Sequence, residues 1–265
     1  MKKGVKILFI ILILIFVGVF IYSAINVIKP LIGYKEARDA YDDLTGQVVQ
    51  SSSGKSGKKE QKEEEAKEEE IVLDPEICPI EVDFDALYEQ CGDIVGWLYC
   101  PDTVINYPVV QCDDNMFYLH RLINGNYNAS GSLFVECQCV PGFKSGNDII
   151  YGHHMNDGSM FAKLVDYTYQ SYYDEHPVMY LLTPKYNYRI ELFAGFVTNM
   201  ESDIYTIDFV DDDVQQAWIE NAIAQSTFES NVDVKGGDKL LTLSTCTYDY
   251  DNARYVVIGK MVAIH

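Results

Sequence analysis

The residues with the clearest chemical potential lie near the C-terminus, where a cysteine and an arginine are eight positions apart. Cys246 follows the apolar run of residues 239–243, and Arg254 precedes a second apolar run at residues 255–258. Both runs have the pattern of β-strands. Two adjacent strands joined by a short loop would bring the thiol and the guanidinium to the same end of a sheet.

Imidazoles follow another apolar run further upstream. Residues 148–151 read as a strand, and Gly152, His153 and His154 come directly after them. A cysteine, a histidine and an arginine at strand ends supply a thiol nucleophile, a proton-transfer group and a stabiliser for an oxyanion. For each residue a structural role is the alternative, because a cysteine at a strand end is most often a small buried apolar residue.

Two segments resemble the sortase family, and class B most closely. One is TLSTC at residues 242–246 with Arg254 downstream, and the other is YGHH at residues 151–154 followed by GSMF at residues 158–161. The resemblance extends from about Leu87 to Val262. It implies a mostly antiparallel eight-stranded β-barrel, with N-terminal helices and a helix between the strands that carry the histidine and the cysteine.

By this resemblance Cys246 is the nucleophile, His153 the acid and base, and Arg254 the oxyanion donor. His154 competes with His153, but the family pattern has the catalytic imidazole directly after glycine. The implied reaction is transpeptidation: the thiolate attacks the threonine carbonyl of a C-terminal sorting motif, and a peptidoglycan amine resolves the thioacyl-enzyme. The family needs no metal and no cofactor for this chemistry.

The substrate groove is assigned by the same resemblance, on less specific motifs. The residues expected to line it are Asn115, Leu119, Ile204, Tyr205 and Ser244.

Three alternatives remain open at this stage. A cell-wall cysteine peptidase of the papain type would place cysteine before histidine, whereas His153 precedes Cys246 here. A pilin-polymerising class C sortase is expected to carry a lid and often a second membrane helix. An inactive adhesion domain would have lost one of the three residues.

Arg254 itself could also be a surface ion-pair partner of Asp249 or Asp251.

The elements that must hold these residues are mostly short strands, which favours a closed or nearly closed barrel. Two helices are predicted: residues 83–91 with Asp83 as the N-cap, and residues 211–228 with three acids, residues 211–213, at the start. The residues predicted to form the inner face of the second helix are Val214, Ala217, Trp218, Ile219 and Ala222. The strands are expected within residues 96–99, 104–110, 131–135, 148–151, 178–182, 188–197, 239–243 and 255–258.

Charge excludes one class of function. Residues 71–265 hold nine of the 20 basic residues and 29 of the 40 acidic ones, so the whole net charge of −20 belongs to this part of the chain. A domain without a basic surface cannot neutralise phosphates, so no nucleic-acid partner is expected. The seven cysteines have irregular spacing, which favours reduced thiols over a disulfide framework.

The N-terminus predicts a membrane anchor. Residues 7–28 are almost entirely apolar and would span about 33 Å as a helix. We therefore expect a cytoplasmic N-terminus at residues 1–6, a transmembrane signal anchor at 7–28, a flexible Ser/Gly-rich and charged spacer at 29–73, and a catalytic domain at 74–265. Within the spacer, residues 29–45 have the pattern of a short amphipathic helix. Lysines before the anchor favour a catalytic domain on the cell-wall side of the membrane, where surface proteins with sorting motifs and peptidoglycan amines are the expected partners. A cleaved signal peptide is the alternative, but the apolar run is too long for one.

Overall fold

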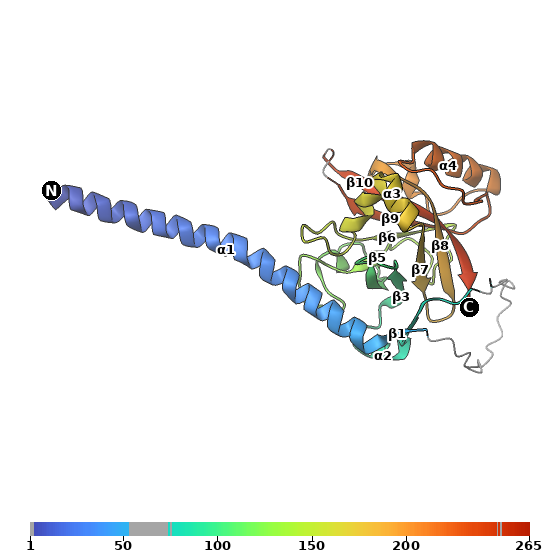
Figure 1. The fold of residues 1–265 in the computed structure, drawn as a ribbon, viewed down its shortest axis with the longest axis horizontal. Coiled ribbons are helices and arrows are strands. Elements are labelled where there is room, and N and C mark those ends of the chain that lie inside the picture. Colours follow the sequence, from blue (N-terminus) through green and yellow to red (C-terminus); the bar gives the residue numbers. More distant parts are fainter. Residues whose placement is uncertain (1–2, 53–73, 75, 248, 250) are drawn as a thin grey trace.

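The computed structural model describes residues 3–52, 74, 76–247, 249 and 251–265. Its main body is a closed barrel of eight strands, in the order β10-β8-β7-β3-β4-β5-β6-β9 (Figure 1). The strands are β3 (Ile94–Tyr99), β4 (Asn106–Val110), β5 (Leu133–Val135), β6 (Asn147–Tyr151), β7 (Val178–Leu182), β8 (Asn187–Asn199), β9 (Leu240–Cys246) and β10 (Ala253–Ile264). The predicted eight-stranded barrel is therefore confirmed.

Six of the eight strand contacts are antiparallel, and two are parallel: β4 with β5, and β6 with β9. The second parallel pair is the one that matters for the site, because it makes β6 and β9 end at the same edge of the barrel. The interior is filled by large side chains, among which Trp97, Leu98, Leu243 and Val257 have no exposed surface.

A helix covers the outside of the barrel at β8, β9 and β10. It is α4 (Asp212–Gln225), and it lies between His153 and Cys246 in the chain as predicted. Asp211 is its N-cap, accepting a 2.8 Å hydrogen bond from the amide of Val214. Trp218 and Ile219 pack with Phe193 and Phe196 of β8 in a second hydrophobic cluster.

The predicted inner face of α4 is partly wrong. Trp218, Ile219 and Ala222 are buried as expected, whereas Val214 and Ala217 are exposed. Gln215 takes a buried position instead: its amide donates to Asp238 O at 2.8 Å and accepts from the amide of Gly237 at 2.7 Å. A polar side chain with both ends paired can occupy the inner face that apolar periodicity assigned to Val214.

The remaining short helices lie in the connections between strands. They are α2 (Phe84–Gln90), which begins after the predicted N-cap Asp83, α3 (Gln170–Glu175), and the 3₁₀ helices η1 (Tyr118–His120), η2 (Ala162–Thr168) and η3 (Asp203–Tyr205).

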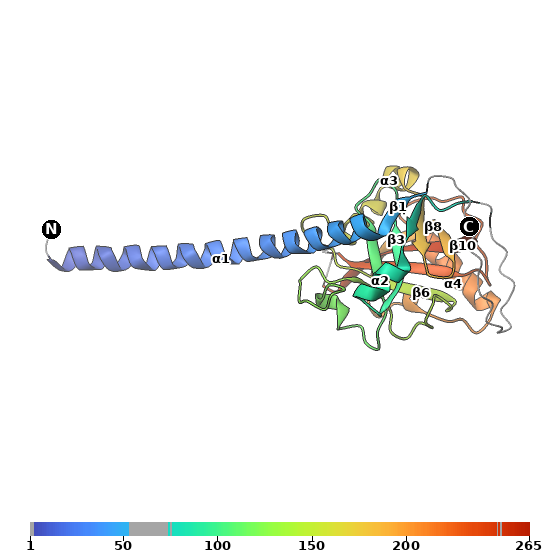
Figure 2. The same ribbon diagram turned by 90° about the horizontal axis from the view of Figure 1, so that it is seen from below.

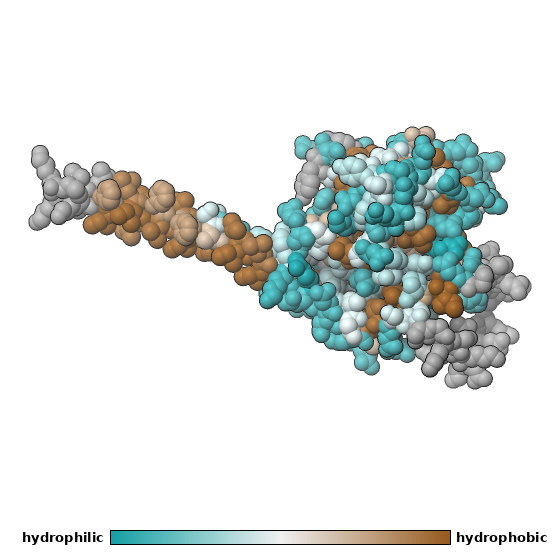
Figure 3. Space-filling model, viewed as in Figure 1, coloured by the Kyte–Doolittle hydropathy of each residue, from teal (hydrophilic) through white to brown (hydrophobic). Residues whose placement is uncertain are grey.

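The N-terminal helix α1 (Lys3–Val48) extends far from the barrel (Figures 1 and 2). Its outer part is apolar and exposed, and it forms the hydrophobic rod seen in Figure 3. By length and composition this helix could cross a membrane, and it is the one helix of the described residues that could. Pro30 lies inside it without ending it.

The other end of α1 packs on the barrel. Ala37, Tyr41, Leu44 and Val48 are buried there, and the hydroxyl of Tyr41 donates to Gly131 O at 2.8 Å. Residues 29–48 of the predicted spacer are therefore helical, which agrees with the amphipathic helix expected for residues 29–45 and disagrees with a flexible tether there. The physical reason is an apolar stripe with helical spacing that this segment buries against the domain.

A short strand continues the chain after α1. It is β1 (Val49–Ser51), which pairs antiparallel with β2 (Ile80–Val82) and so ties the end of α1 to the start of the domain. The rest of the predicted spacer, residues 53–73, lies outside the described residues. All seven cysteines are described, and all are free thiols.

Candidate active site

Cys246 and Arg254 are direct cross-strand partners. In the antiparallel pairing of β9 with β10, Arg254 lies opposite Cys246, and Tyr255 lies opposite Thr245. Opposed residues of an antiparallel pair project from the same face of the sheet, with Cβ atoms about 5 Å apart. The prediction that the thiol and the guanidinium meet at one end of a sheet is confirmed.

His153 reaches this end through the other neighbour of β9. Strands β6 and β9 are parallel, with Tyr151 in register with Ser244. The chain continues alongside β9 for one more residue, since the amide of Gly152 donates to Ser244 O at 3.1 Å and the hydroxyl of Thr245 donates to Gly152 O at 2.8 Å. His153 therefore leaves β6 beside the end of β9 that carries Cys246.

Gly152 is required before the histidine by close packing. A Cβ atom at this position would lie 2.5 Å from Leu133 Cδ2 and 2.6 Å from Phe161 Cδ2. Phe161 in turn donates its amide to His153 O at 2.9 Å, which closes the loop after the histidine. The GHH and GSMF segments are thus parts of one packed loop.

The His153 ring is held by a backbone carbonyl and a second imidazole. Its Nε2 lies 2.6 Å from Leu119 O, and because a carbonyl only accepts, Nε2 carries the proton of the neutral ring. The His120 ring stacks on it at a centroid distance of 5.3 Å. Burial lowers the pKa of His153, and the charges of His120 and Arg254 lower it further, whereas the hydrogen bond to Leu119 raises it by less. Since the net pKa lies below the ordinary value, the ring is mainly neutral at pH 7.

The Arg254 guanidinium makes two contacts, both to uncharged groups. One nitrogen donates to its neighbour Ala253 O at 3.0 Å, and another to Met200 Sδ at 3.0 Å. Within the described part of the chain Arg254 forms no ion pair. The alternative partner Asp249 instead accepts from the Thr247 hydroxyl at 2.5 Å. Most guanidinium donors are thus left for an incoming anion.

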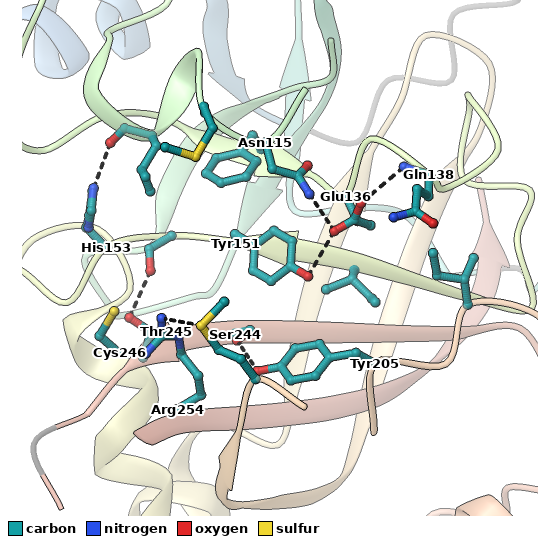
Figure 4. Close-up of a pocket in the computed structure, with 17 residues that line it drawn as sticks. Asn115, Glu136, Gln138, Tyr151, His153, Tyr205, Ser244, Thr245, Cys246 and Arg254 are labelled. Atoms are coloured by element: carbon teal, nitrogen blue, oxygen red, sulfur yellow. Dashed lines mark hydrogen bonds between the residues drawn. The ribbon is translucent and has the colours of Figure 1, made fainter. Parts of the chain in front are cut away.

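A cavity of about 480 Å³ opens between these residues (Figure 4). Its lining includes Cys246, His153 and Arg254 together with four of the five residues predicted for the substrate groove, namely Asn115, Leu119, Tyr205 and Ser244. Tyr205 and Ser244 are joined by a 2.9 Å hydrogen bond between their hydroxyls.

Ile204 is the exception among the predicted groove residues. It is only 3% exposed and packs in the second hydrophobic cluster with Trp218 and Ile219, so it does not line the cavity. Ile204 and Tyr205 are adjacent in the tight turn η3, and consecutive residues of such a turn point in different directions. The turn therefore sends Tyr205 into the cavity and Ile204 into the core.

His154, the competing imidazole, contacts the nucleophile's backbone. Its Nδ1 lies 2.9 Å from Cys246 O, so this nitrogen carries a proton and ties the loop to the end of β9. This contact gives His154 a structural role in the loop. No group of three or more His, Cys, Asp or Glu side chains in the described residues is arranged to hold a metal ion.

Glu136, Tyr151 and Met200 are among the lining residues that the sequence did not identify as site residues. Glu136 follows the short strand β5 directly, and an acid next to an apolar strand was the available signal. Its partners, Asn115 and Tyr151, lie 21 and 15 residues away along the chain, so sequence alone did not connect them.

Comparison with known proteins gives a consistent result. Residues 98–262 match the model of the sortase domain family. Sortase B of Listeria monocytogenes is 37% identical over 172 residues, covering 64% of this chain and 70% of the relative.

Solved structures agree with the sequence relatives. A Staphylococcus aureus sortase B–substrate complex matches with a TM-score of 0.65 and 31% identity, covering 69% of this chain and 85% of that one. The sortase B of B. anthracis in complex with AAEK1 matches with a TM-score of 0.70 and 28% identity, covering 88% and 99% of the two chains.

Proposed function

Since this chain belongs to the sortase family of cysteine transpeptidases, with class B sortases as its relatives, we propose that it anchors surface proteins to the cell wall. In this proposal it cleaves a C-terminal sorting motif through a thioacyl intermediate on Cys246. It then transfers the acyl group to an amine of peptidoglycan. Family membership removes the papain-type peptidase, and the class B relatives disfavour the pilin-polymerising alternative.

The observation that carries the proposal is the cross-strand pairing of Cys246 with Arg254. A thiolate is the nucleophilic form of cysteine, and a neighbouring guanidinium favours it. The same cation suits the oxygen anion that forms when the thiolate attacks a carbonyl, because arginine stays charged and offers several donors in a fixed plane.

The reaction follows from these positions in two half-reactions. Cys246 Sγ attacks the threonine carbonyl, and Arg254 stabilises the oxyanion of the tetrahedral intermediate. The C–N bond then breaks, the leaving amine takes a proton from His153, and the thioester remains. In the second half the incoming amine attacks the thioester, His153 accepts its proton, and the Cys246 thiolate departs.

Proton transfer requires His153 to change charge during the cycle. In the neutral ring Nε2–H is held by Leu119 O, so Nδ1 is the nitrogen with a free lone pair. Burial keeps the pKa of this ring below its ordinary value, which disfavours the protonated ring in the free enzyme. We infer that His153 is protonated in only a fraction of molecules at pH 7, and that this fraction starts the first half-reaction.

We propose that α1 anchors the enzyme and that the barrel lies on the cell-wall side. The apolar, exposed outer part of the helix supports the anchor, and the lysines at its start support this orientation. Because α1 packs on the barrel from about Tyr34 onward, the site would lie close to the membrane surface rather than at the end of a long tether.

The test uses the full chain in detergent micelles with fluorogenic peptides that carry candidate sorting motifs, with and without amine acceptors. Cleavage that depends on Cys246 and a new peptide–amine product are expected. Hydrolysis unaffected by any amine would indicate a peptidase. Equal cleavage by a Cys246→Ala variant, or no cleavage of any peptide, would contradict the proposal.

A further inference from the structure

A buried carboxylate lies at the end of the cavity away from the nucleophile. Figure 4 shows Glu136 on the opposite side of the cavity from His153, Cys246 and Arg254. Glu136 follows the last residue of β5 and is 7% exposed. An acidic residue buried this deeply is uncommon unless a partner compensates it.

The partners of Glu136 are all neutral. One oxygen accepts from Asn115 Nδ2 at 2.7 Å and from the Tyr151 hydroxyl at 3.1 Å. The other oxygen accepts from the amide of Gln138 at 3.2 Å and from Cys137 Sγ at 3.4 Å. Among the described residues Glu136 has no ion pair, so its hydrogen bonds are filled while its charge is not balanced.

This arrangement keeps the carboxylate ionised. Burial raises the pKa of Glu136, but the hydrogen bonds from Asn115, Gln138, Cys137 and Tyr151 outweigh it and lower the pKa below the ordinary value. Glu136 is therefore an anion at neutral pH. A buried anion without a counter-charge is electrostatically costly, and a cation entering the cavity would relieve that cost.

The floor of the cavity connects Glu136 to the nucleophile. Tyr151 donates to Glu136, and its ring lies 6.3 Å from that of Tyr205, whose hydroxyl bonds to Ser244 two residues before Cys246. A peptide with its scissile carbonyl at Cys246 can therefore present a neighbouring side chain to Glu136 along one continuous surface.

The walls suit a side chain with an apolar stem and a charged tip. Phe134 and Ile149 line the same cavity as Glu136. Lysine and arginine bury their methylene groups on apolar surface and keep the charge at the end. A neutral amide side chain on the peptide would be a weaker partner than lysine or arginine. The acceptor positions of Glu136 already have donors, and a neutral group would leave the charge of the carboxylate unbalanced.

We propose that Glu136 is a specificity-determining residue that binds a basic side chain, lysine or arginine, of the sorting motif at a position other than the attacked threonine. This inference rests on the proposed function, because it requires a peptide in the cavity. Asn115, predicted as a substrate contact, is in this proposal a positioning residue: its Nδ2 holds Glu136 while its Oδ1 accepts from the amide of Cys137 at 2.9 Å.

The test is a positional scan on the full chain in detergent micelles. Each position of a cleaved peptide carries either lysine or norleucine, which has the same carbon stem without the charge. At one position kcat/KM for lysine should exceed that for norleucine by about tenfold, as expected when a buried charge gains an opposite charge beside it. In Glu136→Gln this ratio should fall close to one, and in Glu136→Asp it should remain well above one.

The ratio compares two peptides on one protein, so a loss of folded enzyme cancels from it. Glu220→Gln, on the exposed face of α4, makes the same charge change outside the cavity and should leave the ratio unchanged. A parent enzyme with no lysine preference at any position, a preference for norleucine over lysine at every position, or a lysine preference that survives in Glu136→Gln would each overturn the proposal.

A binding measurement separates this inference from the proposed reaction. Fluorescence anisotropy with the same peptides on the Cys246→Ala chain should show tighter binding of the lysine peptide, again dependent on Glu136. Selective binding without cleavage by the parent would contradict the transpeptidation and leave the subsite standing. Cleavage without a lysine preference would overturn the subsite alone.

Discussion

Cys246 and Arg254 face each other across the antiparallel β9–β10 pair, so the distance between thiol and guanidinium is set by sheet geometry rather than by a flexible loop. Among the residues that the structure describes, the guanidinium bonds only to Ala253 O and Met200 Sδ, and neither neutralises it. A preorganised cation of this kind can stabilise charge that develops during a reaction without first being released from an ion pair.

Arg254 should therefore contribute to rate and little to stability. We expect Arg254→Ala to lower kcat about 10²–10³-fold, the range for loss of an oxyanion donor, and Arg254→Lys to retain part of the rate because it keeps the charge without the planar fork. Lys163→Ala, which removes an exposed cation paired with Asp166, is the matched control and should leave kcat unchanged. Equal activity of Arg254→Ala and the parent would remove Arg254 from the mechanism.

The stacked His120 should tune the proton-transfer group. His120 is one of the charges that lower the pKa of His153, after burial, and Phe keeps the ring contact without the charge. In His120→Phe the pKa of His153 should rise, so the limb of the kcat/KM pH profile that belongs to His153 should move to higher pH.

The His120→Phe profile is best measured between pH 5 and 9 beside a matched variant. His265→Phe changes a histidine at the exposed C-terminal end of the described chain, and its profile should match that of the parent. A limb that stays in place, or moves to lower pH, in His120→Phe would show that His120 does not act on His153 electrostatically.

The loop that carries His153 packs so closely that residue 152 must be glycine. Gly152→Ala would force its Cβ against Leu133 and Phe161, and overpacking of this kind costs about 1–3 kcal/mol of unfolding free energy. Because His153 is the next residue, kcat should fall as well. Gly92→Ala meets no atom within 4 Å and should leave both quantities near those of the parent. A fully active, equally stable Gly152→Ala enzyme would contradict this account of the loop.

Sequence reasoning succeeded where a residue's role depends on its chain neighbours. Asp83 caps its helix as predicted, and the TLSTC strand ends in the thiol beside Arg254, because caps and strand pairs are encoded within a few residues. It failed for Glu136 and Ile204, whose surroundings come from distant strands or from the direction of a single turn.

The junction of α1 with the barrel was predictable only in part. Ala37, Tyr41, Leu44 and Val48 recur with helical spacing, which indicates an amphipathic helix but does not identify the surface on which it packs. Only the barrel surface that receives this stripe distinguishes a docked helix from a solvated one, and that surface is assembled from remote parts of the chain.

Tyr41 should be the most sensitive point of this junction. Its ring is 5% exposed and packs edge-on against Tyr107 at 5.3 Å, while its hydroxyl bonds to Gly131 O and Ser132 Oγ. Tyr41→Phe should lower the unfolding free energy by about 1–2 kcal/mol, because it leaves buried acceptors unpaired. Tyr41→Ala should cost about 3–5 kcal/mol.

Thermal unfolding of the solubilised full chain measures both Tyr41 variants, with Tyr169→Phe as the control because Tyr169 is 67% exposed. If Tyr41→Ala unfolds at the same temperature as the parent, α1 does not dock on the barrel in solution.

Asp148 should make the barrel less stable as pH rises. It is fully buried in β6, and neither of its oxygens has a hydrogen-bond partner among the residues that the structure describes. Burial raises its pKa from 3.8 to about 7; the ammonium of Lys239 and the nearby Ser145, which is not in hydrogen-bonding geometry, lower it by less. The folded-state pKa thus lies above the unfolded one, so this contribution to stability is complete below about pH 4 and is lost as pH rises to about 7.

Asp148→Asn keeps the shape and removes the ionisation, so it should stabilise the chain above pH 7 by up to about 4 kcal/mol relative to the parent. The gain should shrink steadily towards pH 4, where the aspartic acid is neutral as well. Urea unfolding of both proteins at several pH values measures this difference, and Asp113→Asn, at an exposed position, should show no such trend. If the gain is the same at pH 5 and pH 8, the pKa of Asp148 does not differ between the folded and unfolded states in the way that its burial requires.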